Sequence, residues 1–251
     1  MSTSLRKDWE RAHRSGFFKA ILAEMEGNSK TAQGRVTLRL LEGYGKGDKV
    51  LEAGCGLGAW AFLFEQMGFE SYGVDFSEVA IKEAAQYARE HDLCSQFCLG
   101  DVRALPFQSN YFDVIVSYGV IEHFNDSKSA VKEILRVLRP GGACLVTTPN
   151  PFNFHRLIGR HILNITKSTR LGYVGKEDDY TPKALARMLK ELGFQEVTCG
   201  ILDEGLLFGM FWQFIPLVGR PLYPLLQKAS LFMERRQSLI GTGSYAIGYK
   251  Y

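Results

Sequence analysis

Glycines and a carboxylate stand together where a predicted buried strand ends. Glu52 lies near the end of an apolar run, and Gly54, Gly56 and Gly58 follow it at alternate positions. Glycine adopts positive φ easily and lets backbone N–H groups approach a ligand, and the helix expected to begin at Ala59 turns its positive end toward the same place. These residue types therefore predict a binding loop for a small polar cofactor.

A second carboxylate narrows the kind of cofactor. The spacing from Gly54 to Ala59 also satisfies the dinucleotide fingerprint, so the loop alone does not distinguish cofactors, and a glycine-rich turn without a ligand is the alternative interpretation. Asp75 ends a second short predicted strand about twenty residues further on, where a carboxylate can accept hydrogen bonds from both ribose hydroxyls. Together, loop and carboxylate predict a cofactor that contains a nucleoside.

More polar residues follow the third and fourth predicted strands. Asp101 can accept a hydrogen bond from a purine amine while Val102 lies against the ring, and capping of a turn is the alternative role for Asp101. Glu122 and His123 fall just past the carboxyl end of the fourth strand. All of these residues are therefore expected along one edge of the same sheet.

The elements that must position these residues alternate along the chain. Strands are predicted over 49–53, 70–74, 96–99, 111–118 and 143–148, with helices over 58–67, 77–91 and 127–138, and a sharp turn at 139–142 leading into the fifth strand. Such alternation predicts an α/β fold with a parallel sheet and helices on both faces, in which ligands bind at the carboxyl ends of the strands. A further helix over 181–192 and strands over 194–202 and 244–249 are expected beyond a long connection.

These motifs resemble those of class I S-adenosylmethionine-dependent methyltransferases, in the broad group that includes ubiquinone and other small-molecule methyltransferases. The matching pieces span about 48–149, in the family's order: Glu52-Ala53-Gly54-Cys55-Gly56-Leu57-Gly58, Gly73-Val74-Asp75-Phe76-Ser77, Gly100-Asp101-Val102, Phe112-Asp113-Val114-Ile115 through Glu122-His123, and Leu138-Arg139-Pro140-Gly141-Gly142. The resemblance implies a Rossmann-like, seven-stranded, mostly parallel sheet that ends in an antiparallel pair.

The resemblance also implies a role for each matching residue. The methionine moiety of S-adenosylmethionine is expected at Glu52, Ala53 and the glycine loop, and the ribose at Asp75. Phe76 is expected to flank the adenine, with Asp101 and Val102 at its amine and ring. Ser117, Tyr118 and Gly119 are expected to line the methionine side.

The expected reaction is methyl transfer to an oxygen or nitrogen of a small acceptor, which leaves S-adenosylhomocysteine as the product. A hydroxyl or protonated amine must lose a proton, and His123 is the best candidate base because histidine titrates near neutral pH. Glu122 is expected to orient the imidazole or to bind the acceptor, although both residues also fit a purely structural role. The alternatives are a non-catalytic regulator that binds the same cofactor and an NAD(P)-dependent oxidoreductase.

The composition of the chain argues against several other classes of protein. The chain has 251 residues, with 46% hydrophobic and 23% charged residues, as expected for a soluble globular protein. A net charge of +3 is too mild to indicate nucleic acid. Its five cysteines lack metal-ligand spacing, so no metal is expected, and neither a signal-peptide pattern nor a membrane span is evident. The sequence therefore predicts a cytoplasmic protein.

We divide the chain into an N-terminal helical lid, 1–45, and a methyltransferase domain, 46–251, with cap insertions at about 150–180 and 203–243. The alternative interpretation of residues 1–45 is that these helices only pack against the sheet and do not form a lid. The apolar, aromatic residues of 203–243 favour a hydrophobic or amphipathic acceptor, such as a quinone, polyketide or lipid-linked glycan precursor. The same segment also fits a homodimer contact or a peripheral membrane contact through 205–236, so monomer and homodimer both remain open.

Overall fold

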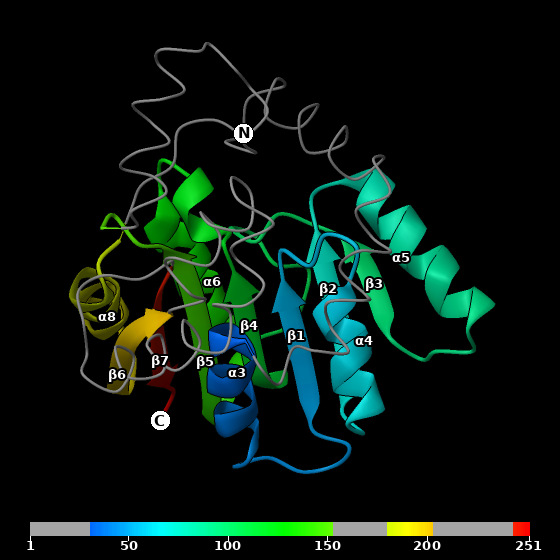
Figure 1. Ribbon diagram of the computed structural model, residues 1–251, viewed down its shortest axis with the longest axis horizontal. Helices are drawn as coiled ribbons and strands as arrows, with labels where there is room; N and C mark the ends of the chain where they lie inside the picture. The colour runs from blue at the N-terminus through cyan, green and yellow to red at the C-terminus, as the bar shows by residue number, and fades with distance from the viewer. Residues whose placement is uncertain (1–30, 153–179, 203–242) are drawn as a thin grey trace, which may run out of the picture.

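A seven-stranded sheet forms the centre of the computed structural model, which describes residues 31–152, 180–202 and 243–251 (Figure 1). Its strands follow the order β3-β2-β1-β4-β5-β7-β6. They comprise β1 (Lys49–Ala53), β2 (Glu70–Asp75), β3 (Gln96–Leu99), β4 (Phe112–Tyr118), β5 (Leu138–Pro149), β6 (Gln195–Leu202) and β7 (Gly243–Tyr249). This confirms the α/β fold that the alternating pattern predicts and the seven strands that the family resemblance implies.

The direction of the strands places the ligand edge. Strands β1 to β5 pair in parallel, whereas β7 runs antiparallel to both β5 and β6. The strand order reverses between β1 and β4, because the chain winds outward from β1 to β3 and then returns to continue on the other side. In open sheets of this kind ligands bind beyond the carboxyl ends of the strands at such a reversal.

Four of the five α-helices in the described residues begin after a capping side chain, whereas the helix after Gly58 begins without one. Ser77, Asp126 and Thr181 each accept a hydrogen bond from the backbone N–H three residues on, as does Thr31. The helices are α3 (Ala32–Leu41), α4 (Ala59–Gln66), α5 (Glu78–Glu90), α6 (Ser127–Val137) and α8 (Pro182–Glu191), with a short 3-10 helix, η2 (Ile121–His123). Within the described residues, the predicted elements therefore lie where the patterns place them, to within a few residues.

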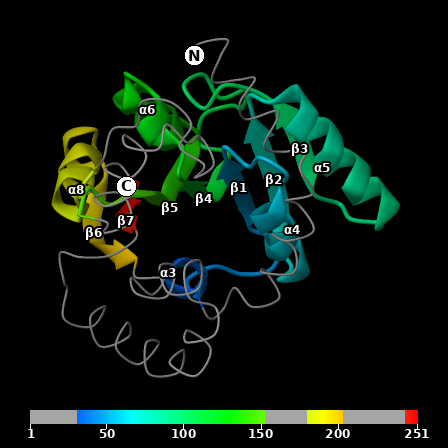
Figure 2. The ribbon, with the colours of Figure 1, turned by 45° about the horizontal axis from the view of Figure 1, so that its top comes forward.

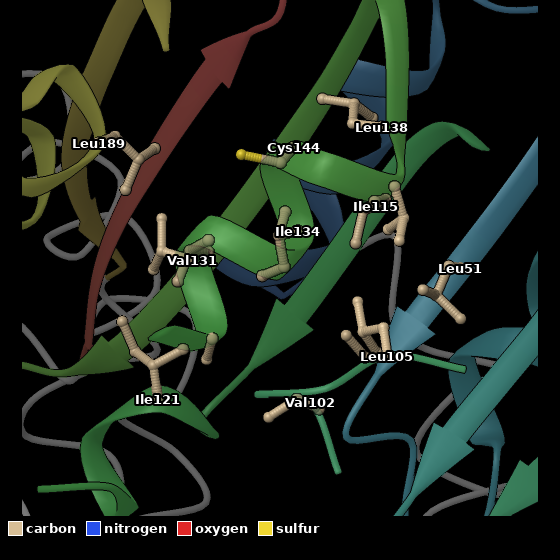
Figure 3. Packing of buried hydrophobic residues seen from close by; sticks show 14 of the residues in the cluster. Leu51, Val102, Leu105, Ile115, Ile121, Val131, Ile134, Leu138, Cys144 and Leu189 are labelled. Carbon is tan, nitrogen blue, oxygen red and sulfur yellow. The ribbon is translucent and has the colours of Figure 1, made fainter. Parts of the chain in front are cut away.

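Alternate residues of the central strands point to opposite faces of the sheet and build two separate cores. Leu51 and Ile115 face α6 and α8, whereas Val50 and Val114 face α3 and α4. Figure 2 shows α6 and α3 on opposite sides of the sheet. The first of these cores, with the side chains of β1, β4, β5 and α6 pointing toward one another, is shown in Figure 3.

The segment 139–142 differs from expectation. A sharp turn before the fifth strand is predicted there, but β5 already begins at Leu138, which pairs with Phe112, and pairing resumes at Ala143 with Val114. The residues between form a bulge in the strand, and Gly141 has a φ of 79°. Its N–H donates to the Lys250 carbonyl (2.7 Å), so the last residues of the chain hold this bulge in the sheet.

Three predicted features lie wholly or largely outside the described residues. They are the first part of the N-terminal lid, the connection at 150–180 and the apolar segment 203–243. Of the lid, the structure describes α3, whose buried side chains pack against the sheet and α4. Among the described residues, no helix is both long and apolar enough to cross a membrane.

Candidate active site

The glycine loop after β1 takes a conformation that side chains would prevent. Gly54 has a φ of 83°, and a Cβ added to it would lie 2.4 Å from Cγ2 of Val120. Gly58 has a φ of 76°, and a Cβ there would lie 2.3 Å from Cε1 of Phe97. The N–H groups of Gly54 and Cys55 both donate to the Val74 carbonyl (2.8 and 2.9 Å), which ties the loop to the end of β2. Glycine is therefore required at Gly54 and Gly58 by both backbone and packing.

We expect Gly58→Ala to destabilise the fold more than a matched glycine substitution. Gly47 provides the control, because it has a similar φ of 85° but no atom lies within 4 Å of an added Cβ. Both variants incur the cost of a left-handed alanine, whereas only Gly58→Ala must displace the Phe97 ring, which packs edge-on against Phe62. The extra loss should be about 1–3 kcal/mol in the free energy of unfolding, measured by chemical denaturation. Equal losses for the two variants would contradict this packing argument.

Asp75 connects three segments at the carboxyl edge. Its Oδ2 accepts from the N–H of Gly56 (2.9 Å) and its Oδ1 from the N–H of Ser77 (2.8 Å). The side chain is buried, with a residue exposure of 6%. The carboxylate at the end of β2 therefore fixes both the glycine loop and the beginning of α5, and Phe76, half-buried, stands between them.

Glu52 brings a second carboxyl group to the same loop. It lies on β1 with a residue exposure of 5%, and its Oε2 accepts from the N–H of Ala61 in the first turn of α4 (3.0 Å). Burial raises the pKa of this carboxyl well above its usual value, and the nearby charge of Asp75 raises it further. The next residue, Ala53, is fully buried in the core. A cationic ligand beside Glu52 would favour the ionised carboxylate.

Asp101 is held by a partner close in the sequence. It accepts from the backbone N–H of Arg103 (2.9 Å) and from its guanidinium at Nε (3.0 Å) and Nη2 (2.6 Å). These bonds hold the pKa of the Asp101 carboxyl below its usual value. Val102, between them, is buried in the core with Ile121 and Phe124. The turn-forming role that the sequence leaves open for Asp101 is therefore present here.

The end of β4 presents its residues to different sides. Ser117 is buried, and Tyr118 faces α3 and α4, where its hydroxyl shares a hydrogen bond with that of Thr37 (2.8 Å) and its ring lies 5.0 Å from that of Trp60. Burial raises the pKa of the Tyr118 phenol. Gly119 has a φ of 65°, and its N–H donates to the Thr147 carbonyl (3.1 Å). This strand end is thereby fixed to both α3 and β5.

Glu122 and His123 lie in η2, directly after this strand. Glu122 has a residue exposure of 2%, whereas His123 is half-buried. The N–H of His123 donates to the Val120 carbonyl (3.2 Å), and a Cβ on Gly119 would lie 3.4 Å from Oε1 of Glu122. Since Val120 also contacts Gly54, the turn that carries Glu122 and His123 packs against the glycine loop.

The structure therefore brings the residues singled out in the sequence to the carboxyl ends of β1, β2, β3 and β4. Three participants were not predicted: Arg103, Val120 and Thr37. Val120 lies within the matched segment 112–123 and Thr37 lies outside any motif, but in both cases only the tertiary contact shows what the side chain touches. For Arg103 a signal existed, because an arginine two residues after an aspartate at a strand end can fold back on the carboxylate.

Comparison with known proteins defines the class. Residues 51–146 match the family model described as a methyltransferase domain. The chain is 34% identical over 116 residues to 2-methyl-6-phytyl-1,4-hydroquinone methyltransferase of Synechocystis sp., an alignment that covers 43% of this chain and 36% of that protein. It is 30% identical over 159 residues to phosphoethanolamine N-methyltransferase 3 of Arabidopsis thaliana, covering 60% and 29%. The chain spans less than half of the length of these curated relatives.

The fold has solved counterparts. Phosphoethanolamine N-methyltransferase 2 of Haemonchus contortus, in complex with phosphomonomethylethanolamine and S-adenosylhomocysteine, superimposes with a TM-score of 0.64 at 17% identity, over 99% of this chain and 60% of that one. The sheet order, the glycine loop and the match across 51–146 together define a class I S-adenosylmethionine-dependent methyltransferase domain. This chain contains such a domain, as the resemblance of its motifs predicts.

Proposed function

We propose that this chain transfers the methyl group of S-adenosylmethionine to an oxygen or nitrogen of a small, hydrophobic or amphipathic acceptor. The observation that carries the proposal is the bond from Gly56 to Asp75, which sets the glycine loop beside two buried carboxyl groups. The two carboxyl groups beside this loop offer hydrogen-bond acceptors to hydroxyls and to a cation. This set of groups fits an amino acid joined to a nucleoside.

Each side chain has a proposed part in holding the cofactor. Glu52, Ala53 and the glycine loop bind the methionine moiety. Burial raises the pKa of Glu52, and the positive charge of the bound methionine moiety would favour its ionised carboxylate. Asp75 accepts from the ribose hydroxyls. Phe76, Asp101 and Val102 bind the adenine. Ser117, Tyr118 and Gly119 line the methionine side, Tyr118 with its backbone, because its side chain faces α3 and α4.

His123 and Glu122 form the proposed catalytic pair. When bound, S-adenosylmethionine supplies a methyl group that its sulfonium charge already activates. The protein therefore has to align the acceptor, exclude water and remove a proton. His123 accepts the acceptor's proton on an imidazole nitrogen, and buried Glu122 orients the imidazole or the acceptor.

The names of related proteins support a small acceptor. The relatives include methyltransferases named for tocopherol, for a phytyl hydroquinone and for phosphoethanolamine. The first two names describe ring hydroxyl compounds with long apolar chains, in keeping with the aromatic composition of 203–243. We infer an acceptor of amphipathic character for this chain as well.

Titration calorimetry with S-adenosylmethionine, S-adenosylhomocysteine and NAD tests the proposal. We expect the first two to bind and NAD not to bind, whereas binding of NAD alone would indicate an oxidoreductase. A screen of small hydroxyl and amine compounds with a labelled methyl donor then separates an enzyme from a regulator. If the cofactor binds but no quinol, phenol, lipid amine or related compound is labelled, the result favours a non-catalytic regulator over an enzyme.

A further inference from the structure

The face of the sheet that packs against α6 and α8 changes from apolar residues to hydroxyl residues near the carboxyl ends of the strands. The apolar core on that face includes one residue each from β4, β5 and β7, namely Ile115 (labelled in Figure 3), Val146 and Ala246. Because side chains of a strand alternate between its faces, the residues two positions nearer the carboxyl edge lie on the same face. They are Ser117, Thr148 and Ser244. A row of three hydroxyl residues therefore follows the core across three neighbouring strands.

The three hydroxyls are buried and unsatisfied. Ser117, Thr148 and Ser244 have residue exposures of 1%, 3% and 0%, and none of their side-chain oxygens has a hydrogen-bond partner among the described residues. Buried hydroxyls in folded proteins are in the large majority hydrogen-bonded, because burial removes them from water. Three unsatisfied hydroxyls in one row therefore indicate a place where a bound molecule supplies the polar partners.

Thr148 and Ser244 are positioned to contact the same atom of a ligand. Their Cα atoms are partners in the antiparallel pairing of β5 with β7. The Cβ atoms of directly opposite residues lie about 4.5–5.5 Å apart, so two such hydroxyls can both hydrogen-bond one oxygen. Ser117 lies on β4, between this pair and the strand that carries the glycine loop. The row therefore leads from the proposed methionine side outward to Thr148 and Ser244.

The residues along the strands around this pair favour a neutral ligand group. Those that flank Thr148 and Ser244, or pair with Ser244 from β6, are all uncharged: Thr147, Pro149, Gly243, Tyr245 and Ile201. The short helix η2, which contacts β5, contributes the buried carboxyl group of Glu122. A phosphate ester would meet no cation at these strand positions, whereas a hydroxyl both donates and accepts hydrogen bonds and suits a neutral hydroxyl or carbonyl.

We propose that Thr148 and Ser244 form a subsite for a second oxygen of the methyl acceptor, and that the acceptor is an uncharged compound with two oxygens, such as a quinol. This inference rests on the proposed function, in which one oxygen of the acceptor receives the methyl group near His123. The two hydroxyls bind the other oxygen and so fix the orientation of the acceptor. They determine specificity and take no proton from the acceptor.

A matched pair of acceptors measures the contribution of this subsite. A 2-alkylhydroquinone and the alkylphenol that lacks its second hydroxyl are each supplied to the purified protein with labelled S-adenosylmethionine. We expect kcat/KM to be about tenfold higher or more for the hydroquinone, because the phenol leaves both protein hydroxyls unpaired. Phosphoethanolamine should not be methylated. Equal kcat/KM for the hydroquinone and the phenol, or methylation of phosphoethanolamine alone, would overturn the inference.

Thr148→Val and Ser244→Ala each remove one hydroxyl and nearly preserve the volume of the side chain. Each should lower the hydroquinone-to-phenol ratio of kcat/KM by about fivefold, mainly by raising KM for the hydroquinone. Neither should lower the free energy of unfolding, since a hydroxyl without a partner contributes no hydrogen bond to the fold. If these variants lose stability and keep the ratio of wild type, the two hydroxyls are only structural and the inference is wrong.

Ser71→Ala is the matched control for loss of a buried hydroxyl. Ser71 lies on β2 with a residue exposure of 4%, but its hydroxyl donates to the Ala61 carbonyl (2.6 Å). Its removal should lower the free energy of unfolding, because the carbonyl loses a donor. The hydroquinone-to-phenol ratio should remain that of wild type.

The affinity for S-adenosylhomocysteine separates failure of this inference from failure of the proposed function. Thr148→Val and Ser244→Ala should bind it within about twofold of wild type, because neither residue is assigned to the cofactor. If the wild-type protein itself does not bind S-adenosylhomocysteine, the proposed function is wrong. If it binds but neither the hydroquinone nor the phenol is methylated, the cofactor site stands and the acceptor class inferred from Thr148 and Ser244 is wrong.

Discussion

Asp75→Ala should weaken the binding of S-adenosylhomocysteine at least tenfold, equivalent to about 1.4 kcal/mol. The carboxylate has two tasks, because it accepts from the N–H groups of Gly56 and Ser77 and is proposed to accept from the ribose hydroxyls. Alanine leaves both N–H groups without this acceptor and removes one of the contacts that hold the glycine loop. Calorimetric titration measures the change.

Asp48→Ala is the matched control for this effect. The carboxylate of Asp48 also accepts a hydrogen bond from a backbone N–H, in this case the N–H of Gly45 (2.8 Å). Asp48 lies directly before β1, at the end of the strand away from the glycine loop. Its removal should leave the affinity for S-adenosylhomocysteine within about twofold of wild type. An unchanged affinity in Asp75→Ala itself would remove Asp75 from the cofactor site.

A 2′-deoxy analogue of S-adenosylhomocysteine separates the two tasks of Asp75. If the carboxylate contacts the ribose, loss of the hydroxyl weakens binding to wild type but has little further effect on Asp75→Ala, since the partner is already gone. If Asp75 acts only through the loop, the analogue loses the same factor in both proteins. This thermodynamic cycle, which combines one protein variant with one ligand analogue, thus decides whether the proposed ribose contact exists.

The fold could be predicted closely because its local signals agree with one another. Short apolar runs such as 114–116 mark strands covered on both faces, and Thr181 followed by Pro182 marks the beginning of α8. The bulge at 139–142 escaped prediction since glycines after a proline indicate a turn equally well. The backbone partner that Gly141 and Gly142 find in the sheet is Lys250, more than a hundred residues away, and no local pattern announces that contact.

The candidate site was predictable only to the level of the sheet edge. Because parallel strands end on the same edge, the residues after β1, β2, β3 and β4 had to lie near one another. Which groups each carboxylate contacts depends on side-chain packing. Asp101 pairs with Arg103, and Tyr118 turns toward Thr37 on α3, and neither contact leaves a periodic pattern in the sequence.

His123→Ala should lower turnover by about 10²–10⁴-fold while the affinity for S-adenosylhomocysteine stays within about twofold. The proposed base acts on the acceptor's proton, which moves only during the reaction, so its loss affects the rate and not the binding of the cofactor. Turnover is measured as formation of S-adenosylhomocysteine with an acceptor found in the labelled-methyl screen.

A second histidine shows whether the effect is specific. His91→Ala removes an exposed imidazole that stacks on Tyr87 at the end of α5, 3.9 Å between ring centroids, and it should leave turnover unchanged. Added imidazole should partly restore His123→Ala, because a small base can occupy the space of the missing ring, whereas a misfolded turn would not respond. If His123→Ala keeps near-native turnover without added imidazole, the acceptor reaches the methyl group already deprotonated. Glu122 and His123 would then only shape the turn that packs Val120 against Gly54.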